Sequence, residues 1–243
     1  ALHVNFTTER SGYPSSLMGT IAHIRQSFID ADYYAARRAQ YAKSPAGLKR
    51  PAYDARLEAL VPYVKDREPV VFQCNNQEDI KRALKIAAEF KLNAVLAGAN
   101  EAWRVADVLK KSPVPLLVAL DFRPPASSKY ATQGEELRKR AEAEIYPANA
   151  AALAKEGIAF ALVSGANADG ASVLKAVRAA IKAGLAEDAA LRALTLQPAR
   201  ALGLDRALGS LEPGKIANIV LVKGDLFDDN AQVARVLVDG VLF

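Results

Sequence analysis

The stretch AGLAEDAALRALTLQPARALGLDRALGSLEPGKIANIVLVKGD, residues 183–225, decides the fold of this 243-residue chain. Its apolar positions Leu191, Leu194 and Leu202 recur at helical spacing, and Gly203 is a helix stop. Two short β segments follow, and we expect the Glu-Pro-Gly-Lys run at 212–215 to join them as a turn. On its own, this pattern predicts a helix followed by a β-hairpin.

The residue types in this stretch also form a longer motif. TLQPARALGL at 195–204 is followed by GSLEPGKIANIVLVKGD at 209–225. Together they resemble the C-terminal signature of the amidohydrolase superfamily, in particular its imidazolonepropionase-like branch. Because the match extends over several elements in order, it is more specific than a short motif. The alternative interpretation is an unrelated helix and hairpin rich in Ala and Leu.

Strands and helices alternate upstream of this motif. Continuously apolar runs between helices are typical of parallel strands that helices cover. We expect strands at 69–73, 93–97, 114–120 and 158–163, followed by helices at 78–90, 101–111, 135–156 and 172–183. A short strand at Leu2, Val4 and Phe6 and helices at 16–43 and 53–64 precede them. The four βα units amount to half of a (β/α)₈ barrel, which takes about 250 residues when complete.

The predicted fold class is therefore α/β, the C-terminal half of a TIM-like (β/α) barrel with a short β tail. The resemblance implies that this tail belongs to the family's small β-sandwich and that the first barrel strands lie upstream. We assign residues 1–209 to the partial barrel with its leading helices, and residues 210–243 to the tail. Because half a barrel leaves strand edges unpaired, we expect the protein's own missing N-terminal portion or a second copy of the chain to complete it.

The resemblance also implies a metal site at the carboxyl ends of the barrel strands, where barrels of this kind carry their active sites. Members of the family bind one or two divalent metals, usually zinc, and an aspartate takes a proton from metal-bound water. By resemblance, Gln73 and Gly98 stand at metal-binding histidine positions, Gly165 at the catalytic aspartate, and Asn75 where a second histidine often sits. Because an amide is a poor zinc ligand and glycine has no side chain, we expect the metal site to be lost.

Four other residues are weaker candidates for a metal or catalytic role. His3 lies beside the first predicted strand, and His23 lies on an amphipathic helix, where a structural role is expected. Asp169 could face the barrel mouth, but Asn-Ala-Asp-Gly is also an ordinary turn before a helix. Cys74 has no histidine nearby in sequence, so we interpret it as a buried, inert thiol.

Polar side chains directly after the strands form a further set of candidates. They could line a pocket for a polar ligand, or they could keep buried polar groups satisfied in an inactive site. The set comprises Gln73, Asn75, Asn76, Asn100, Glu101, Asp121, Arg123 and Ser164. As ligand-binding candidates we retain Gln73, Asn75, Asn100, Asp121 and Asp169.

Composition narrows the classes of partner. The net charge of +5 is mild, and the basic residues are interspersed with Glu and Asp without aromatic interleaving, so we expect no nucleic-acid partner. No apolar run approaches the roughly 20 residues that a membrane-spanning helix needs. The single cysteine excludes an internal disulfide but leaves the cellular compartment open.

Three functional interpretations remain. The first is an amidohydrolase-like domain that has lost its metal and serves as a structural or interaction module. The second is the C-terminal part of an active metal-dependent hydrolase of non-peptide C–N bonds, with further ligands upstream of residue 1. The third is a metal-free barrel that binds a small ligand through its amide cluster.

Overall fold

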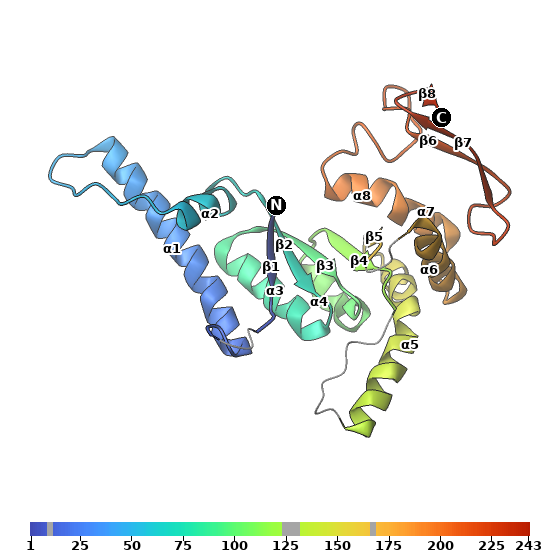
Figure 1. The fold of residues 1–243 in the computed structure, drawn as a ribbon, viewed down its shortest axis with the longest axis horizontal. Coiled ribbons are helices and arrows are strands. Elements are labelled where there is room, and N and C mark those ends of the chain that lie inside the picture. Colours follow the sequence, from blue (N-terminus) through green and yellow to red (C-terminus); the bar gives the residue numbers. More distant parts are fainter. Residues whose placement is uncertain (9–11, 123–131, 166–168) are drawn as a thin grey trace. The chain divides into compact units, whose positions relative to one another are not determined.

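The computed structural model describes residues 1–8, 12–122, 132–165 and 169–243 (Figure 1). It contains a five-stranded sheet in the order β1-β2-β3-β4-β5 and a three-stranded sheet in the order β6-β7-β8. The strands are β1 (Leu2–Asn5), β2 (Pro69–Cys74), β3 (Asn93–Gly98), β4 (Leu116–Ala119), β5 (Ala161–Val163), β6 (Ile219–Lys223), β7 (Gln232–Val238) and β8 (Val241–Leu242). The helices are α1 (Leu17–Lys43), α2 (Ala55–Lys65), α3 (Gln77–Phe90), the 3₁₀ helix η1 (Ala102–Val105), α4 (Ala106–Lys111), α5 (Gln133–Lys155), α6 (Gly170–Lys182), α7 (Glu187–Leu194) and α8 (Leu196–Ala201).

The parallel α/β sheet and the separate β sheet confirm the predicted fold class. The chain divides into two compact units, of which the first comprises residues 1–74 and 78–96 and the second comprises residues 75–77 and 97–243. The predicted boundary between residues 209 and 210, and the membership of the tail in a β-sandwich, stay predictions. None of the helices in the described ranges is long and apolar enough to cross a membrane.

In the first unit, β1 and β2 pair in parallel, with Val4 opposite Phe72 and Asn5 opposite Gln73. Because side chains alternate along a strand, Val4 and Phe72 share one face and Asn5 and Gln73 the other. Phe72 is fully buried, whereas Asn5 and Gln73 are exposed. The sheet therefore has an apolar face and a face with polar residues near its carboxyl edge.

Helix α1 packs on α3 through an aromatic contact and an ion pair. The rings of Phe28 and Phe90 lie 5.4 Å apart, and Arg25 Nε lies 2.8 Å from Glu89 Oε2. The N-terminus of α1 is capped by Ser16, whose hydroxyl accepts a hydrogen bond from the Gly19 N–H. The expected long helix over 16–43 is thus confirmed.

In the second unit, β4 and β5 pair in parallel, with Leu117 opposite Ala161 and Ala119 opposite Val163. Helix α5 begins with a capping box, in which Thr132 and Glu135 each accept a hydrogen bond from the other's backbone N–H. It continues through Pro147 to Lys155. The strands β4 and β5 are shorter than the apolar runs 114–120 and 158–163, because residues 114–115 and 158–160 lie in the connections that enter the sheet and Leu120 follows β4.

Two expectations for the deciding stretch are wrong. The helical pattern through Leu202 is divided at Thr195 into α7 and α8, since Pro198 has no N–H to donate to the carbonyl of Leu194 and its ring disfavours a continuous helix there. The Glu-Pro-Gly-Lys run at 212–215 is a turn, but the antiparallel hairpin lies further on, between β6 and β7.

Candidate functional site

The loop after β3 has an unusual backbone that a buried asparagine holds in place. Gly98 and Ala99 have φ values of 92° and 50°. Asn149 of α5 is 2% exposed, and its Nδ2 donates to the Ala99 carbonyl at 2.9 Å while its Oδ1 accepts from the Trp103 N–H at 3.0 Å. Both functions of this amide are therefore used to position the loop.

Glu101 connects this loop to the loop that follows β2. Its backbone N–H donates to the Asn75 carbonyl at 3.1 Å, and its Oε2 accepts from the Gln77 N–H at 3.0 Å. A carboxylate that accepts a backbone N–H at a helix start stabilises that start. The predicted candidates Asn75 and Glu101 are thus brought together.

Asn100 and Asp121 are also brought together. The Asn100 side-chain Nδ2 lies 3.4 Å from the Asp121 carbonyl oxygen, a long hydrogen bond between the loops after β3 and β4. Both residues are half-buried. Three consecutive loops of the second unit are therefore linked at the carboxyl edge by amide and carboxylate groups.

Gly165 lies two residues after the end of β5, close to Asp121 in the loop that follows β4. Its φ is 61°, and a Cβ built on it would lie 3.1 Å from Asp121 Cβ and 3.3 Å from Ala119 Cβ. A side chain at this position would be strained in its backbone conformation and crowded by its neighbours. The backbone conformation and the neighbouring atoms therefore both favour glycine at position 165.

The remaining candidates have local structural roles or lie elsewhere. Asp169 caps α6, accepting the Ser172 N–H at 2.7 Å, and this backbone hydrogen bond is the main cause that lowers the pKa of the Asp169 carboxyl. Cys74 is fully buried, and its Sγ lies 3.2 Å from the Phe72 carbonyl oxygen. Gln73 belongs to the first unit and lies opposite Asn5, and Arg123 lies outside the described residues.

The two histidines share one cavity of the first unit. His3 and His23 both line a hollow of about 420 Å³ beside β1, together with Tyr13, whose ring contacts the His23 ring edge-on at 5.7 Å. Within the described residues, no three His, Cys, Asp or Glu side chains are grouped so that they could hold a metal ion.

Sequence reasoning missed Asn149 and Asn5. Asn149 lies 46 and 50 residues from the two groups to which it is hydrogen-bonded, so no local sequence pattern predicts these contacts. The available signal was a single amide within the otherwise apolar run Ala148 to Leu153, because a buried polar side chain is expected to have hydrogen-bond partners. Asn5 could have been found as the polar residue that ends the first strand.

Comparisons with known proteins agree with this architecture. Residues 133–243 match the sequence profile of the Amidohydrolase family. An amidohydrolase from Thermotoga maritima MSB8 has 27% sequence identity and a TM-score of 0.81, over 99% of this chain and 61% of that chain. An ochratoxinase from A. niger, at 16% identity and a TM-score of 0.58, shares the fold over 79% of this chain and 45% of its own.

A curated relative matches a shorter stretch. Adenine deaminase 1 from Desulfotalea psychrophila (strain LSv54 / DSM 12343) is 44% identical over 66 residues, which is 27% of this chain and 11% of that protein. The chain thus spans less than two thirds of the Thermotoga protein and a small part of the deaminase. Residues 133–243 are thus similar to the Amidohydrolase family, and the chain has the fold of the amidohydrolase TIM barrels.

Proposed function

We propose that this chain is an amidohydrolase-family domain without a metal centre of its own, and that it acts as a structural or interaction module. The observation that carries the proposal is the backbone at the carboxyl edge of the sheet. Amidohydrolases are generally metal-dependent, so the residues at the ligand positions of this chain decide whether it can follow that chemistry.

The residues at these positions do not fit a zinc ion. Gly98 and Gly165 have positive φ values, 92° and 61°, which favour glycine over residues with a Cβ. At Gly165 a Cβ would also crowd Asp121. Gln73 offers an amide, a poor ligand for zinc. At Gly98 and Gly165, therefore, the backbone conformation as well as the missing side chain disfavours a metal ligand.

Nearby acidic side chains are engaged in other roles. The Glu101 carboxylate accepts the Gln77 N–H, and the Asp169 carboxylate accepts the Ser172 N–H. Each of these carboxylates stabilises the start of a helix, so its role is structural. This supports a domain whose carboxyl edge is held together by hydrogen bonds.

An activity assay tests the proposal. The chain is incubated with Zn²⁺, Co²⁺ or Mn²⁺ and assayed against N-acyl amino acids, dipeptides and adenine, with the Thermotoga amidohydrolase assayed in parallel as a comparison. We expect no metal-dependent turnover by this chain. Saturable turnover that a chelator removes and that Asp121→Asn alters would contradict the proposal.

The second candidate is a part of an active hydrolase whose remaining ligands lie in another segment. This candidate is supported by the coverage, because the chain matches only 61% of the Thermotoga protein. Its distinguishing result is metal-dependent turnover by the longer protein that Asp121→Asn or Gln73→Ala abolishes. A longer protein whose turnover is unaffected by both substitutions would favour the non-catalytic module.

A further inference from the structure

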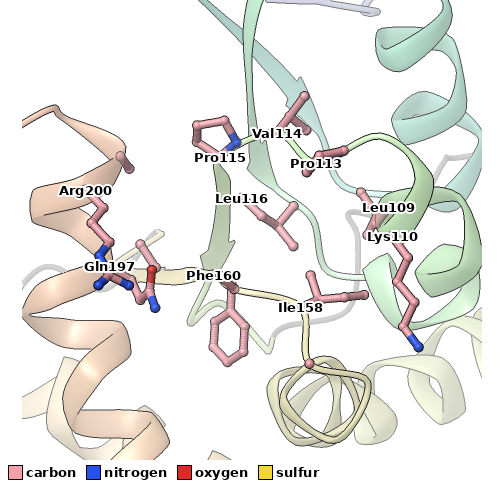
Figure 2. Close-up of a pocket in the computed structure, with 14 residues that line it drawn as sticks. Leu109, Lys110, Pro113, Val114, Pro115, Leu116, Ile158, Phe160, Gln197 and Arg200 are labelled. Carbon is pink, nitrogen blue, oxygen red and sulfur yellow. The ribbon is translucent and has the colours of Figure 1, made fainter.

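A cavity of about 480 Å³ lies at the amino ends of β4 and β5, the opposite edge from the candidate site. Its volume is in the range of about 300–1,000 Å³ that small-molecule sites occupy. Residues from the α4 end, the connections into β4 and β5, and α8 line it (Figure 2). The cavity is contained in the second unit.

The wall of this cavity is largely apolar and includes buried side chains. Leu109, Leu116 and Phe160 contribute to it and are 4%, 2% and 5% exposed. Pro113 and Pro115 also line the cavity and are exposed, and neither has a backbone N–H to offer a ligand. The greater part of the cavity therefore suits a hydrocarbon body and offers few hydrogen-bond donors.

Two polar side chains lie together at one side of the cavity, across from Lys110 (Figure 2). Arg200 and Gln197 of α8 lie beside each other there, and Leu109 and Ile158 lie at the opposite side (Figure 2). Within the described part of the chain, neither the Arg200 nor the Gln197 side chain has a hydrogen-bond or ion-pair partner. Lys110, the other lining cation, is paired with Glu156 at 2.5 Å. The cavity thus carries one uncompensated positive charge next to an amide.

We propose that this cavity binds an amphipathic monocarboxylate, with its carboxylate held by Arg200 and Gln197 and its hydrocarbon body against Phe160, Ile158 and Leu109. A guanidinium presents a planar fork of N–H donors that matches the two carboxylate oxygens. One positive charge suits a monoanion. The site does not depend on the carboxyl edge of the sheet, so it goes beyond the proposed function.

Octanoate is the probe for this site, with octan-1-ol and octylammonium as neutral and cationic counterparts. Titration calorimetry and saturation-transfer NMR on the whole chain should show saturable binding of one octanoate. Affinity should rise about fourfold for each methylene from butanoate upward until the cavity is full. Octan-1-ol and octylammonium should bind at least about tenfold more weakly, a difference of about 1.4 kcal/mol.

Variants separate this cavity from other apolar surfaces. Arg200→Met should weaken octanoate binding at least about tenfold. Arg192→Met on α7, where Arg192 is exposed and lies 3.1 Å from Asp188, is the matched control and should leave binding unchanged. Ala201→Phe keeps Arg200 and should remove binding by filling the cavity. Each variant is checked for a native unfolding transition before titration.

Three results would overturn the proposal. The first is the absence of saturable octanoate binding by the unmodified chain. The second is equal binding of octanoate and octan-1-ol. The third is octanoate binding that Arg200→Met leaves unchanged. Because Arg200 is exposed, Arg200→Met keeps the proposal testable even if Ala201→Phe does not fold.

Discussion

Single glycines decide what the carboxyl edge can hold. Gly165 and Gly203 share a positive φ, 61° and 69°, but only Gly165 has neighbours that a Cβ would crowd. Nothing lies within 4 Å of a Cβ built at Gly203. The pair therefore separates the cost of the backbone conformation from the cost of crowding.

Gly203→Ala should lower the free energy of unfolding by about 1–2 kcal/mol, the cost of a left-handed conformation for a residue with a Cβ. Gly165→Ala should lose about 1–3 kcal/mol more, because its Cβ would meet Asp121 Cβ at 3.1 Å. Denaturant unfolding of both variants measures the difference. Equal losses would show that position 165 has room for a side chain and that Asp121 does not crowd it.

The buried amide of Asn149 leads to a second prediction at this scale. Asn149→Ala leaves the Ala99 carbonyl and the Trp103 N–H without their partner, and each orphaned buried group costs about 1–3 kcal/mol. We expect a loss of about 2–4 kcal/mol in denaturant unfolding. Asn230→Ala, at an exposed position, is the control and should change little. A loss no larger than that of the control would show that the hydrogen bonds of Asn149 do not stabilise the loop after β3.

Helices α1 and α2 are joined by a polar cluster. Tyr34 donates its hydroxyl to Glu58 Oε2 at 2.8 Å, and Arg38 pairs with the same carboxylate. The Tyr34 hydrogen bond is the largest cause that lowers the pKa of Glu58, followed among the stabilising contacts by Arg38. A carboxyl whose pKa is lower in the folded state stabilises the fold above its unfolded pKa, and this contribution is lost as pH falls through the folded pKa.

Glu58→Gln should therefore destabilise the chain most near neutral pH. Between about pH 7 and about pH 3, the gap in unfolding free energy between the parent and Glu58→Gln should narrow, because protonation neutralises Glu58 in the parent. The narrowing should be smaller in a Tyr34→Phe background, which lacks the main hydrogen bond. Urea unfolding at both pH values tests this, and a gap that stays constant with pH would argue against the linkage.

The elements were predictable from sequence to an uneven degree. Local periodicity predicted α1 and α3, and continuously apolar runs between helices predicted the parallel strands. The division of the helix at Thr195 depends on Pro198, which disrupts the helical turn before it. The spacing of apolar residues alone does not reveal this effect. The hairpin was expected at the nearest Pro-Gly turn, but its register is determined by pairing between β6 and β7.

The candidate site was predictable only as a set of positions. Parallel strands bring their carboxyl ends to one edge, which is why the sequence placed these polar residues in one set. In the structure, Glu101 bonds to Asn75 and Asn100 bonds to Asp121. The hydrogen bonds of Asn149 to the loop after β3, and the crowding at Gly165, involve residues that are distant in sequence. Long-range contacts of this kind follow from the packed fold and not from local pattern.

Strands β1 and β5 are the outer strands of the five-stranded sheet. Strand edges are usually covered in native proteins, because their unpaired backbone groups favour further pairing. We propose that a further segment of the same protein, or a second copy of this chain, covers them. The purified chain should accordingly self-associate in light scattering, with β1 and β5 amides protected from hydrogen exchange only in the associated form. A monodisperse monomer with protected edge amides would contradict this.

The metal content of the purified chain is the first test of the proposal that this domain holds no metal ion of its own. The purified chain is incubated with excess zinc, freed of loosely bound metal and measured by elemental mass spectrometry. We predict no stoichiometric zinc, because Gln73, Gly98 and Gly165 offer no suitable ligand set. About one tightly held zinc per chain would contradict the account and would direct mutagenesis to His3, His23 and Asp169.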